Sequence, residues 1–215
     1  MLFKIKNRLI LTLCAIAVFL FFSSAAKIGL DLNWNLTLGA NTLICVAIGV
    51  GIIGVSDGIV HLLLWLVWGK AYFDRYLELA EYFRPQGVPE ILAGGFLASA
   101  EELIFRGVLL QGILSAYPSA LSQGLGIGAT SLIFGAVHIL PEQPRLRPFF
   151  FWAVWESVIL SCLYIWSGSL LVCMIVHGIH DIAGFTAFKL QRYWNEKDSK
   201  DKKDKKDNKG SGRNL

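Results

Sequence analysis

Long apolar runs separated by short polar segments dominate this chain. Crossing the hydrocarbon core of a bilayer takes about 20 mostly apolar residues in an α-helix, and each run is close to that length or longer. The pattern therefore predicts an all-α, polytopic membrane helix bundle with about six transmembrane helices. The six runs cover residues 9–26, 42–69, 88–114, 120–140, 149–166 and 169–188.

The first run follows Lys4, Lys6 and Arg8 and so has the outline of a signal peptide. Because it is longer than a typical signal core, we expect it to be retained as the first transmembrane helix. With the second run it forms the first expected unit of the chain, two N-terminal transmembrane helices within residues 1–69.

The polar connections predict the remaining units. Residues 70–90 mix charged with apolar side chains and are expected to form an amphipathic helix on the membrane surface. Residues 91–190 are expected to form a four-helix core, within which the proline-rich segment 141–148 is a loop. The Lys-Lys-Asp repeats of residues 191–215 cannot bury a core, so this basic tail is expected to be disordered.

Composition supports the membrane assignment. Of the 215 residues, 54% are hydrophobic and only 17% are charged, which leaves too little polar surface for a soluble domain. The formal net charge of +4 comes entirely from the eight Lys/Arg and four Asp between Lys197 and Arg213. The basicity thus gives no indication of a nucleic-acid partner. The four cysteines lie in apolar runs without CxxC spacing, so we expect neither a disulfide framework nor a thiolate zinc site.

Positive residues fix the expected orientation. They gather in four segments, which are the N-terminus, residues 70–90, residues 141–148 and the tail. If the chain crosses the membrane six times, these four segments lie on the same side. The connections on the opposite side carry only Lys27. Lysine and arginine mark the cytoplasmic side of a membrane protein. We therefore expect both termini to be cytoplasmic, in a bacterial-type inner membrane or a plasma membrane.

Three charged residues interrupt the third apolar run, within the stretch 100–107. A charge at membrane depth is costly and normally has a partner inside the protein. On an α-helix, Glu102 and Arg106 share a face and can form an ion pair. Glu101 lies about 100° round the helix from Glu102, away from Arg106. The spacing thus predicts a supporting Glu102–Arg106 pair and leaves the Glu101 carboxylate without a local partner.

Other polar residues occur in the fourth and sixth apolar runs. His138 ends the fourth run, and His177, His180 and Asp181 lie in the sixth. If the helices pack as a bundle, Glu101, His138, His177 and Asp181 can converge from three spans. Any one of them alone is more often a satisfied helix–helix contact, but four together favour a functional site.

The second run contains Asp57 and His61, which are four residues apart and can pair on one helix face. We interpret them as an internal polar pair or an interfacial contact rather than as catalytic residues. The fifth run contains Glu156, to which the sequence assigns no role.

Two chemistries fit the four converging residues. A carboxylate beside a histidine can hold and deprotonate a water for peptide hydrolysis, and a second histidine can donate a hydrogen bond to the developing oxyanion. One glutamate and two histidines are also an acceptable ligand set for catalytic zinc. Because the sequence contains no HExxH motif, we expect no metal cofactor and keep zinc as the alternative.

Three motifs in order resemble the CPBP family, the intramembrane glutamate endopeptidases that include CAAX prenyl proteases and bacteriocin-processing enzymes. They are Glu101-Glu102-x-x-x-Arg106, Phe134-x-x-x-His138 and His177-x-x-x-Asp181. The first motif alone would be weak, but the ordered triple is specific. The resemblance covers about residues 88–190 and leaves out the first two spans and the tail.

The resemblance implies that Glu101 and His138 activate the water and that His177 and Asp181 shape the oxyanion site. Glu102, Arg106 and Phe134 would be supporting residues. Asp181 departs from the family, whose last motif often ends in asparagine, because an ionised carboxylate cannot donate a hydrogen bond as an amide does.

The function that follows is an intramembrane endopeptidase that cleaves a membrane protein or a lipidated or small peptide at the bilayer. Two other classes remain open. The first is a non-catalytic membrane scaffold or immunity protein of the same fold. The second is a proton-coupled transporter, for which a repeat of broken helices would be the expected sign, and the sequence shows no such repeat.

Overall fold

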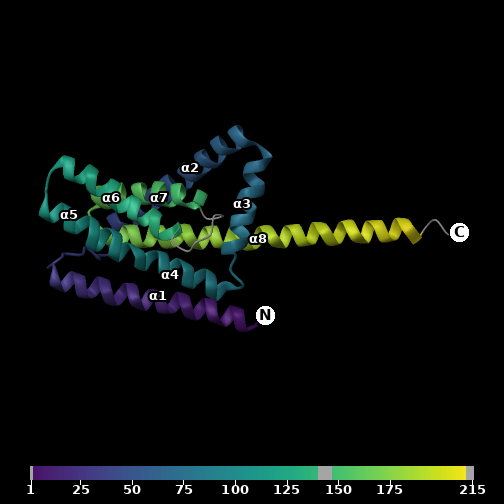
Figure 1. Ribbon diagram of the computed structural model, residues 1–215, viewed down its shortest axis with the longest axis horizontal. Coiled ribbons are helices and arrows are strands. Elements are labelled where there is room, and N and C mark those ends of the chain that lie inside the picture. The colour runs from purple at the N-terminus through teal and green to yellow at the C-terminus, as the bar shows by residue number, and fades with distance from the viewer. Residues whose placement is uncertain (1, 140–146, 212–215) are drawn as a thin grey trace.

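The computed structural model describes residues 2–139 and 147–211, and all regular elements within them are helices (Figure 1). The predicted all-α class is confirmed over these residues. Most of the expected loop at 141–148 lies outside the described residues, and its last two positions begin a helix. The elements are α1 (Leu2–Gly29), α2 (Ala40–Trp68), α3 (Lys70–Phe83), α4 (Val88–Ile104), the π-helix η1 (Phe105–Leu110), α5 (Gln111–Ala116), α6 (Ala120–Ile139), α7 (Arg147–Ser167) and α8 (Leu170–Ser211).

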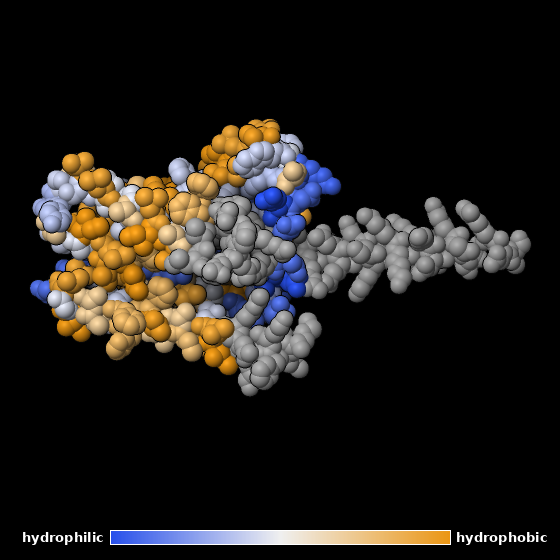
Figure 2. Space-filling view, viewed as in Figure 1, coloured by the Kyte–Doolittle hydropathy of each residue, from blue (hydrophilic) through white to orange (hydrophobic). Residues whose placement is uncertain are grey.

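Five helices are long and apolar enough to cross a membrane, and they correspond to five of the six predicted spans. The predicted third span differs, because α4 has only 17 residues and contains Glu101 and Glu102 in its last turn. Its helical backbone nevertheless continues through η1 and α5 to Ala116. Large apolar side chains such as Phe21 and Leu66 face outward, and hydrophobic residues cover much of the visible face of the bundle (Figure 2). The protein is an integral, multi-pass membrane protein.

α4 lies between α1 and α8 (Figure 1). Two apolar clusters join the other helices of the bundle. The first joins α2, α7 and α8 around Ile53, Leu160 and Val176. The second joins η1, α6 and α7 around Phe105, Phe134 and Ala153. The polar side chains of the candidate site lie among these helices.

α4 and α8 approach each other closely through small residues. A Cβ atom added to Gly95 would lie 2.9 Å from the Gly178 carbonyl oxygen, and one added to Gly178 would lie 3.0 Å from the Gly95 oxygen. Ser99 in α4 donates a hydrogen bond to the Met174 carbonyl oxygen of α8 at 2.8 Å. Small residues of this kind let membrane helices pack backbone to backbone. The close crossing brings the polar residues of α8 within reach of those of α4.

The helix widens into η1 at Phe105, three residues after Glu102, although the sequence predicted one continuous α-helix. Wide π-turns inside α-helices are frequent at functional sites. The Gly107 carbonyl oxygen in η1 accepts a hydrogen bond from the Trp34 indole at 2.8 Å. A Cβ atom on Gly107 would lie 3.0 Å from that indole nitrogen, so glycine makes room for it. The loop between α1 and α2 thus contacts and supports η1, the wide turn that follows Glu101 and Glu102.

α3 turns back from α2 at Gly69, whose φ of +55° suits glycine. Two tyrosines of α3 attach it to the bundle, since the Tyr72 hydroxyl lies 2.6 Å from His61 Nδ1 and the Tyr76 ring lies 4.8 Å from the His61 ring. Burial, with smaller contributions from Tyr76 and Asp57, raises the pKa of Tyr72 to about 12, so its phenol stays neutral. Among the described residues His61 Nδ1 is bonded to Tyr72 and Asp57 is bonded to His180, so the pair that Asp57 and His61 could form on one helix face is not observed there.

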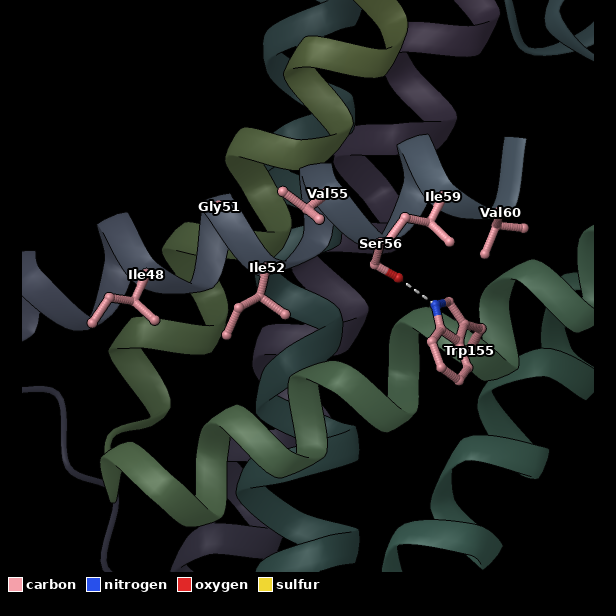
Figure 3. A pocket seen from close by; sticks show the side chains of 8 residues that line it. All are labelled: Ile48, Gly51, Ile52, Val55, Ser56, Ile59, Val60 and Trp155. Carbon is pink, nitrogen blue, oxygen red and sulfur yellow. Dashed lines mark hydrogen bonds between the residues drawn. The ribbon is translucent and has the colours of Figure 1, made fainter. Parts of the chain in front are cut away.

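An apolar groove of about 520 Å³ runs along the outer side of α2, where α7 crosses it (Figure 3). The Trp155 indole of α7 donates a hydrogen bond to the Ser56 hydroxyl of α2 across this groove. The groove contains no charged side chain, and it is lined by Ile48, Gly51, Ile52, Val55, Ser56, Ile59, Val60 and Trp155.

The sequence predicts a disordered tail, but the described part of the tail is helical. It forms the end of α8, which continues as one helix to Ser211 and projects beyond the bundle (Figure 1). In the sequence, aspartates precede lysines by four positions, as in Asp198 and Lys202 or Asp201 and Lys205. Pairs of opposite charge at this spacing favour a helix. Low hydrophobicity alone therefore did not decide the structure of this segment.

The close crossing of α4 and α8 leads to a stability prediction with an internal control. Gly178→Ala adds a methyl group that would lie 2.4 Å from the Ser99 hydroxyl oxygen, whereas nothing lies within 4 Å of the same group at Gly184. We expect Gly178→Ala to destabilise the protein by about 1–3 kcal/mol. Gly184→Ala should be neutral or stabilise it by up to about 1 kcal/mol. Thermal unfolding in detergent measures both, and equal shifts in the two variants would contradict the proposed close contact.

Candidate functional site

Glu102 and Arg106 form a fully buried ion pair one helical turn apart. Their side chains are 0% and 1% exposed, and Arg106 Nη1 donates to Glu102 Oε1 at 2.8 Å. Arg106 Nη2 donates to the carbonyl and hydroxyl oxygens of Ser157 in α7, at 2.7 and 2.8 Å. The pair predicted from helical spacing is confirmed. The bonds to Ser157 supply the additional partners that a buried ion pair needs.

His177 of α8 completes this arrangement. Its Nδ1 donates to the same Glu102 Oε1 at 2.7 Å, and the residue is only 3% exposed. One carboxylate oxygen of Glu102 therefore accepts from Arg106 in its own helix and from His177 in another. Because Nδ1 is used in this bond, the ring turns Nε2 away from Glu102, and Nε2 lies 3.8 Å from Glu156 Oε1.

Glu101 differs from its neighbour. Within the described part of the chain, the structure gives it no hydrogen bond and no ion pair. The charges that act on it are those of His177, Asp181, Glu102 and Glu156. The carboxylate that the sequence left without a local partner thus remains unpaired in the folded protein, at the centre of a group of titratable side chains.

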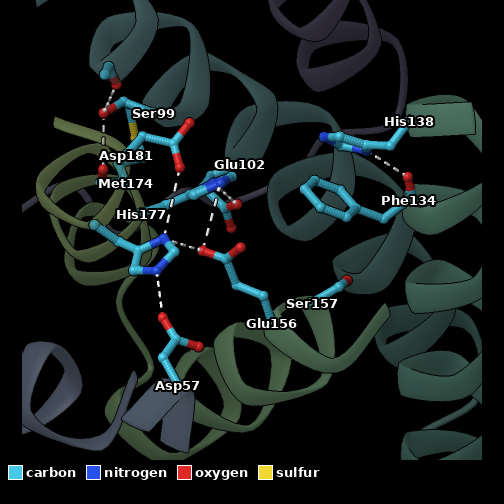
Figure 4. Close-up of polar contacts among 12 residues, drawn as sticks. Asp57, Ser99, Glu102, Phe134, His138, Glu156, Ser157, Met174, His177 and Asp181 are labelled. Carbon is cyan, nitrogen blue, oxygen red and sulfur yellow. Dashed lines mark hydrogen bonds and ion pairs between the residues drawn. The ribbon is translucent and has the colours of Figure 1, made fainter. Parts of the chain in front are cut away.

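Phe134 and His138 lie on the other side of the site from Asp57 (Figure 4). His138 Nδ1 is 2.7 Å from the Phe134 carbonyl oxygen. A carbonyl oxygen can only accept, so Nδ1 carries the proton, and Nε2 of the neutral ring is left as an acceptor. The Phe134 ring lies 4.4 Å from the His138 ring and 5.8 Å from the His177 ring. Phe134 therefore separates the two histidines and fixes the position of each.

Phe134 also contacts the buried ion pair. The Arg106 guanidinium lies 5.3 Å from its ring centroid, a distance at which a cation is attracted to an aromatic face. The Phe105 ring packs edge-on against it at 4.8 Å. Phe134 is 1% exposed, so this supporting residue joins α6 to η1 and to the polar core.

Three further residues extend the polar cluster, and sequence reasoning gave none of them a role in the site. Asp57 of α2 accepts from His180 Nε2 at 2.7 Å, and His180 Nδ1 lies 2.8 Å from Glu156 Oε1 of α7. Asp181 Oδ1 lies 3.5 Å from His180 Nδ1. A charged residue inside a predicted span usually has a function or a charged partner. The position of Glu156 in the fifth apolar run was therefore an indication that it belongs to a polar cluster. Which partners it has depends on how α2, α7 and α8 pack.

The predicted site residues are thus gathered in one region but not all in contact. Glu156, His177 and Asp181 each offer a ligand atom within 4.8 Å of the others, a spacing that could hold a metal ion. Within the described residues, Glu101 and His138 are not joined by a hydrogen bond or an ion pair.

Comparison with protein-family models matches residues 85–183 to the family described as Rce1-like, type II CAAX prenyl endopeptidase. Neither the comparison with curated proteins nor that with solved structures gives a match. The matched segment contains all seven predicted site residues, whereas Asp57 lies before it. Residues 85–183 of this chain thus match the model of a protease family, the Rce1-like type II CAAX prenyl endopeptidases, and this match confirms the resemblance to the CPBP family.

Proposed function

We propose that this protein is an intramembrane endopeptidase that hydrolyses a peptide bond with a water activated by Glu101 and His138. The observation that carries the proposal is the difference between two adjacent glutamates. Glu102 is held by Arg106 and His177, whereas Glu101 has charged neighbours but no bonded partner among the described residues. A carboxylate that stabilises no ion pair is available to take a proton.

The reaction begins with a water between Glu101 and His138. His138 presents an unprotonated Nε2, because its Nδ1–H is bonded to the Phe134 carbonyl, and Nε2 accepts a hydrogen bond that orients the water. Glu101 takes the proton of the water as its oxygen attacks the peptide carbonyl carbon. The same proton then passes from Glu101 to the leaving amine nitrogen as the C–N bond breaks.

The carbonyl oxygen becomes negative during this attack and needs donors. His177 is held by Glu102 through Nδ1, and with both ring nitrogens protonated its Nε2–H can donate to the oxyanion. Asp181 lies four residues further along α8, beside the same ring. Asp181 can donate only when it is protonated and otherwise orients His177, because an ionised carboxylate only accepts.

The substrate class follows from where the site lies. Glu101, Glu102 and Arg106 are enclosed by membrane-spanning helices, so the scissile bond belongs to a membrane protein, a lipidated protein or a small peptide that enters the bilayer. The proposed reaction uses no metal cofactor, since the pair assigned to the water is not part of the ligand-spaced group Glu156, His177 and Asp181. A non-catalytic scaffold would leave the unpaired Glu101 without an explanation.

The two glutamates should respond differently to substitution. Glu101→Gln removes the base but breaks no bond seen in the structure, so it should fold like wild type and cleave nothing. Glu102→Ala leaves Arg106 as an uncompensated buried charge, a change that typically costs about 3–5 kcal/mol. Unfolding in detergent and cleavage of a peptide library by purified protein measure the two effects.

Each variant is the control for the other, because the two positions are adjacent in the same helix. Full turnover by Glu101→Gln would contradict the general-base assignment. A Glu102→Ala variant that is inactive but as stable as wild type would show that Glu102, and not Glu101, acts in the reaction.

We further propose that both termini are cytoplasmic, in a bacterial-type inner membrane or a plasma membrane. The proposal rests on the positive residues at the N-terminus, at 70–90, at 141–148 and in the tail. It requires the helical stretch from Val88 to Ala116 to cross the membrane as the third of six spans.

Cysteine labelling in a background free of the four native cysteines tests this orientation. An impermeant reagent should label Leu38→Cys from outside intact cells and Ser199→Cys only after permeabilisation. Leu38 is exposed and is preferable to Asn35, whose side chain bonds the Gly168 carbonyl. Tyr117→Cys, beyond the third crossing, should behave like Leu38→Cys. Labelling of positions 38 and 199 from the same side would overturn the six-span arrangement.

A further inference from the structure

The polar core contains more negative than positive groups. Five carboxylates lie in it, from Asp57, Glu101, Glu102, Glu156 and Asp181, and they are connected by the histidine contacts or act on one another electrostatically. Within the part of the chain that the structure describes, Arg106 is the permanent cation bonded to this group, and it is bonded to Glu102. Carboxylates at membrane depth need compensating positive charge, supplied by protons or by a bound cation.

The geometry around His177 Nε2 favours a cation. This nitrogen lies 3.8 Å from Glu156 Oε1, which is too long for a hydrogen bond. Two ligand atoms that each lie about 2.1 Å from the same ion are about 3.4 Å from each other when the ligand–ion–ligand angle is tetrahedral, and about 3.8 Å when that angle is about 130°. The distance between His177 Nε2 and Glu156 Oε1 therefore suits two ligands of one ion. Asp181 offers a third ligand atom, within 4.8 Å of the other two.

The three ligand-spaced side chains are also held in place by neighbours. Glu102 accepts from His177 Nδ1 and so directs Nε2 toward Glu156, which is how carboxylates orient histidines that bind metals. His180 lies 2.8 Å from Glu156 Oε1 and is itself held by Asp57. Glu156 is only 9% exposed, and its Oε1 is paired with His180 Nδ1 in a contact that lacks good hydrogen-bond geometry. The same oxygen lies 3.8 Å from His177 Nε2, so it faces both histidines.

We propose that Glu156, His177 and Asp181 form a binding site for a divalent cation of the zinc type. One imidazole nitrogen with two carboxylate oxygens suits zinc and its transition-metal neighbours better than magnesium or calcium, which prefer all-oxygen sites. Three protein ligands also leave a fourth position open. The set contains neither Glu101 nor His138, so it is separate from the pair assigned to the water.

The site has a consequence for activity that rests on the proposed function. His177 Nε2 cannot bind a cation and donate a hydrogen bond to an oxyanion at the same time. Occupancy therefore inhibits hydrolysis, and the cation acts as a regulator of the protease and not as its cofactor.

Metal binding is measured without reference to activity. Protein purified in detergent and stripped with a chelator is titrated with Co²⁺, whose visible absorbance reports ligation, and then with Zn²⁺ in competition. We expect one ion per chain in wild type. Removing even an outer partner of a metal ligand costs about 10–100-fold in affinity, so Glu156→Gln should lose at least that much.

Two other variants guard against misfolding and non-specific binding. Asp181→Asn is nearly isosteric and removes one ligand charge, so it should also lose at least 10-fold in affinity, by the same reasoning. Glu78→Gln changes an exposed glutamate of α3 and should bind like wild type. A wild type that binds no ion, or equal binding by Glu156→Gln and Glu78→Gln, overturns the site whether or not any peptide is cleaved.

The activity measurement tests the link to His177. Chelator-stripped wild type should cleave its peptide, added Zn²⁺ should inhibit it, and Glu156→Gln should resist that inhibition. Stoichiometric binding without inhibition would contradict the shared use of His177. Activity that is lost on chelation and restored by zinc would make the ion a cofactor and overturn the regulatory role.

Discussion

The bond from His177 to Glu102 is the interaction on which the candidate site depends. It joins α8 to α4, it engages a glutamate that Arg106 already neutralises, and it fixes which ring nitrogen faces the rest of the site. The bond forms only because Gly95 and Gly178 let the two helices approach backbone to backbone. With Glu102 committed to these partners, the proposed mechanism assigns the water to the adjacent Glu101. In that mechanism helix packing gives two identical side chains different roles, one supporting and one chemical.

Local spacing made part of this arrangement predictable. Glu102 and Arg106 meet because residues four apart share a helix face, and five of the six apolar runs agree within a few residues with helices that can cross a membrane. The contacts of Glu156 with His180 and of His180 with Asp57 could not be predicted, because they depend on how three separate helices pack. The wide turn of η1 was missed for the same reason, since the Trp34 indole that bonds it comes from a distant loop.

The segment before the family match contributes directly to the site. The α1–α2 loop supplies Trp34 to the turn after the glutamates, and the Asn35 carbonyl accepts from the first backbone N–H groups of α8. α2 supplies Asp57, which holds His180 beside Glu156 and Asp181. The CPBP motif that this chain resembles often ends in asparagine, which carries no charge. This chain has a carboxylate there, and His180 Nδ1 lies 3.5 Å from it.

In the proposed mechanism Glu101 acts as a base on water and not as a nucleophile. A single turnover in ¹⁸O-labelled water, followed by mass spectrometry of the product and of the peptide that carries Glu101, tests this role. A general base never bonds to the substrate, so we expect ¹⁸O in the new carboxylate of the product and none in Glu101. Label in the Glu101 side chain would show a covalent intermediate and contradict the general-base role.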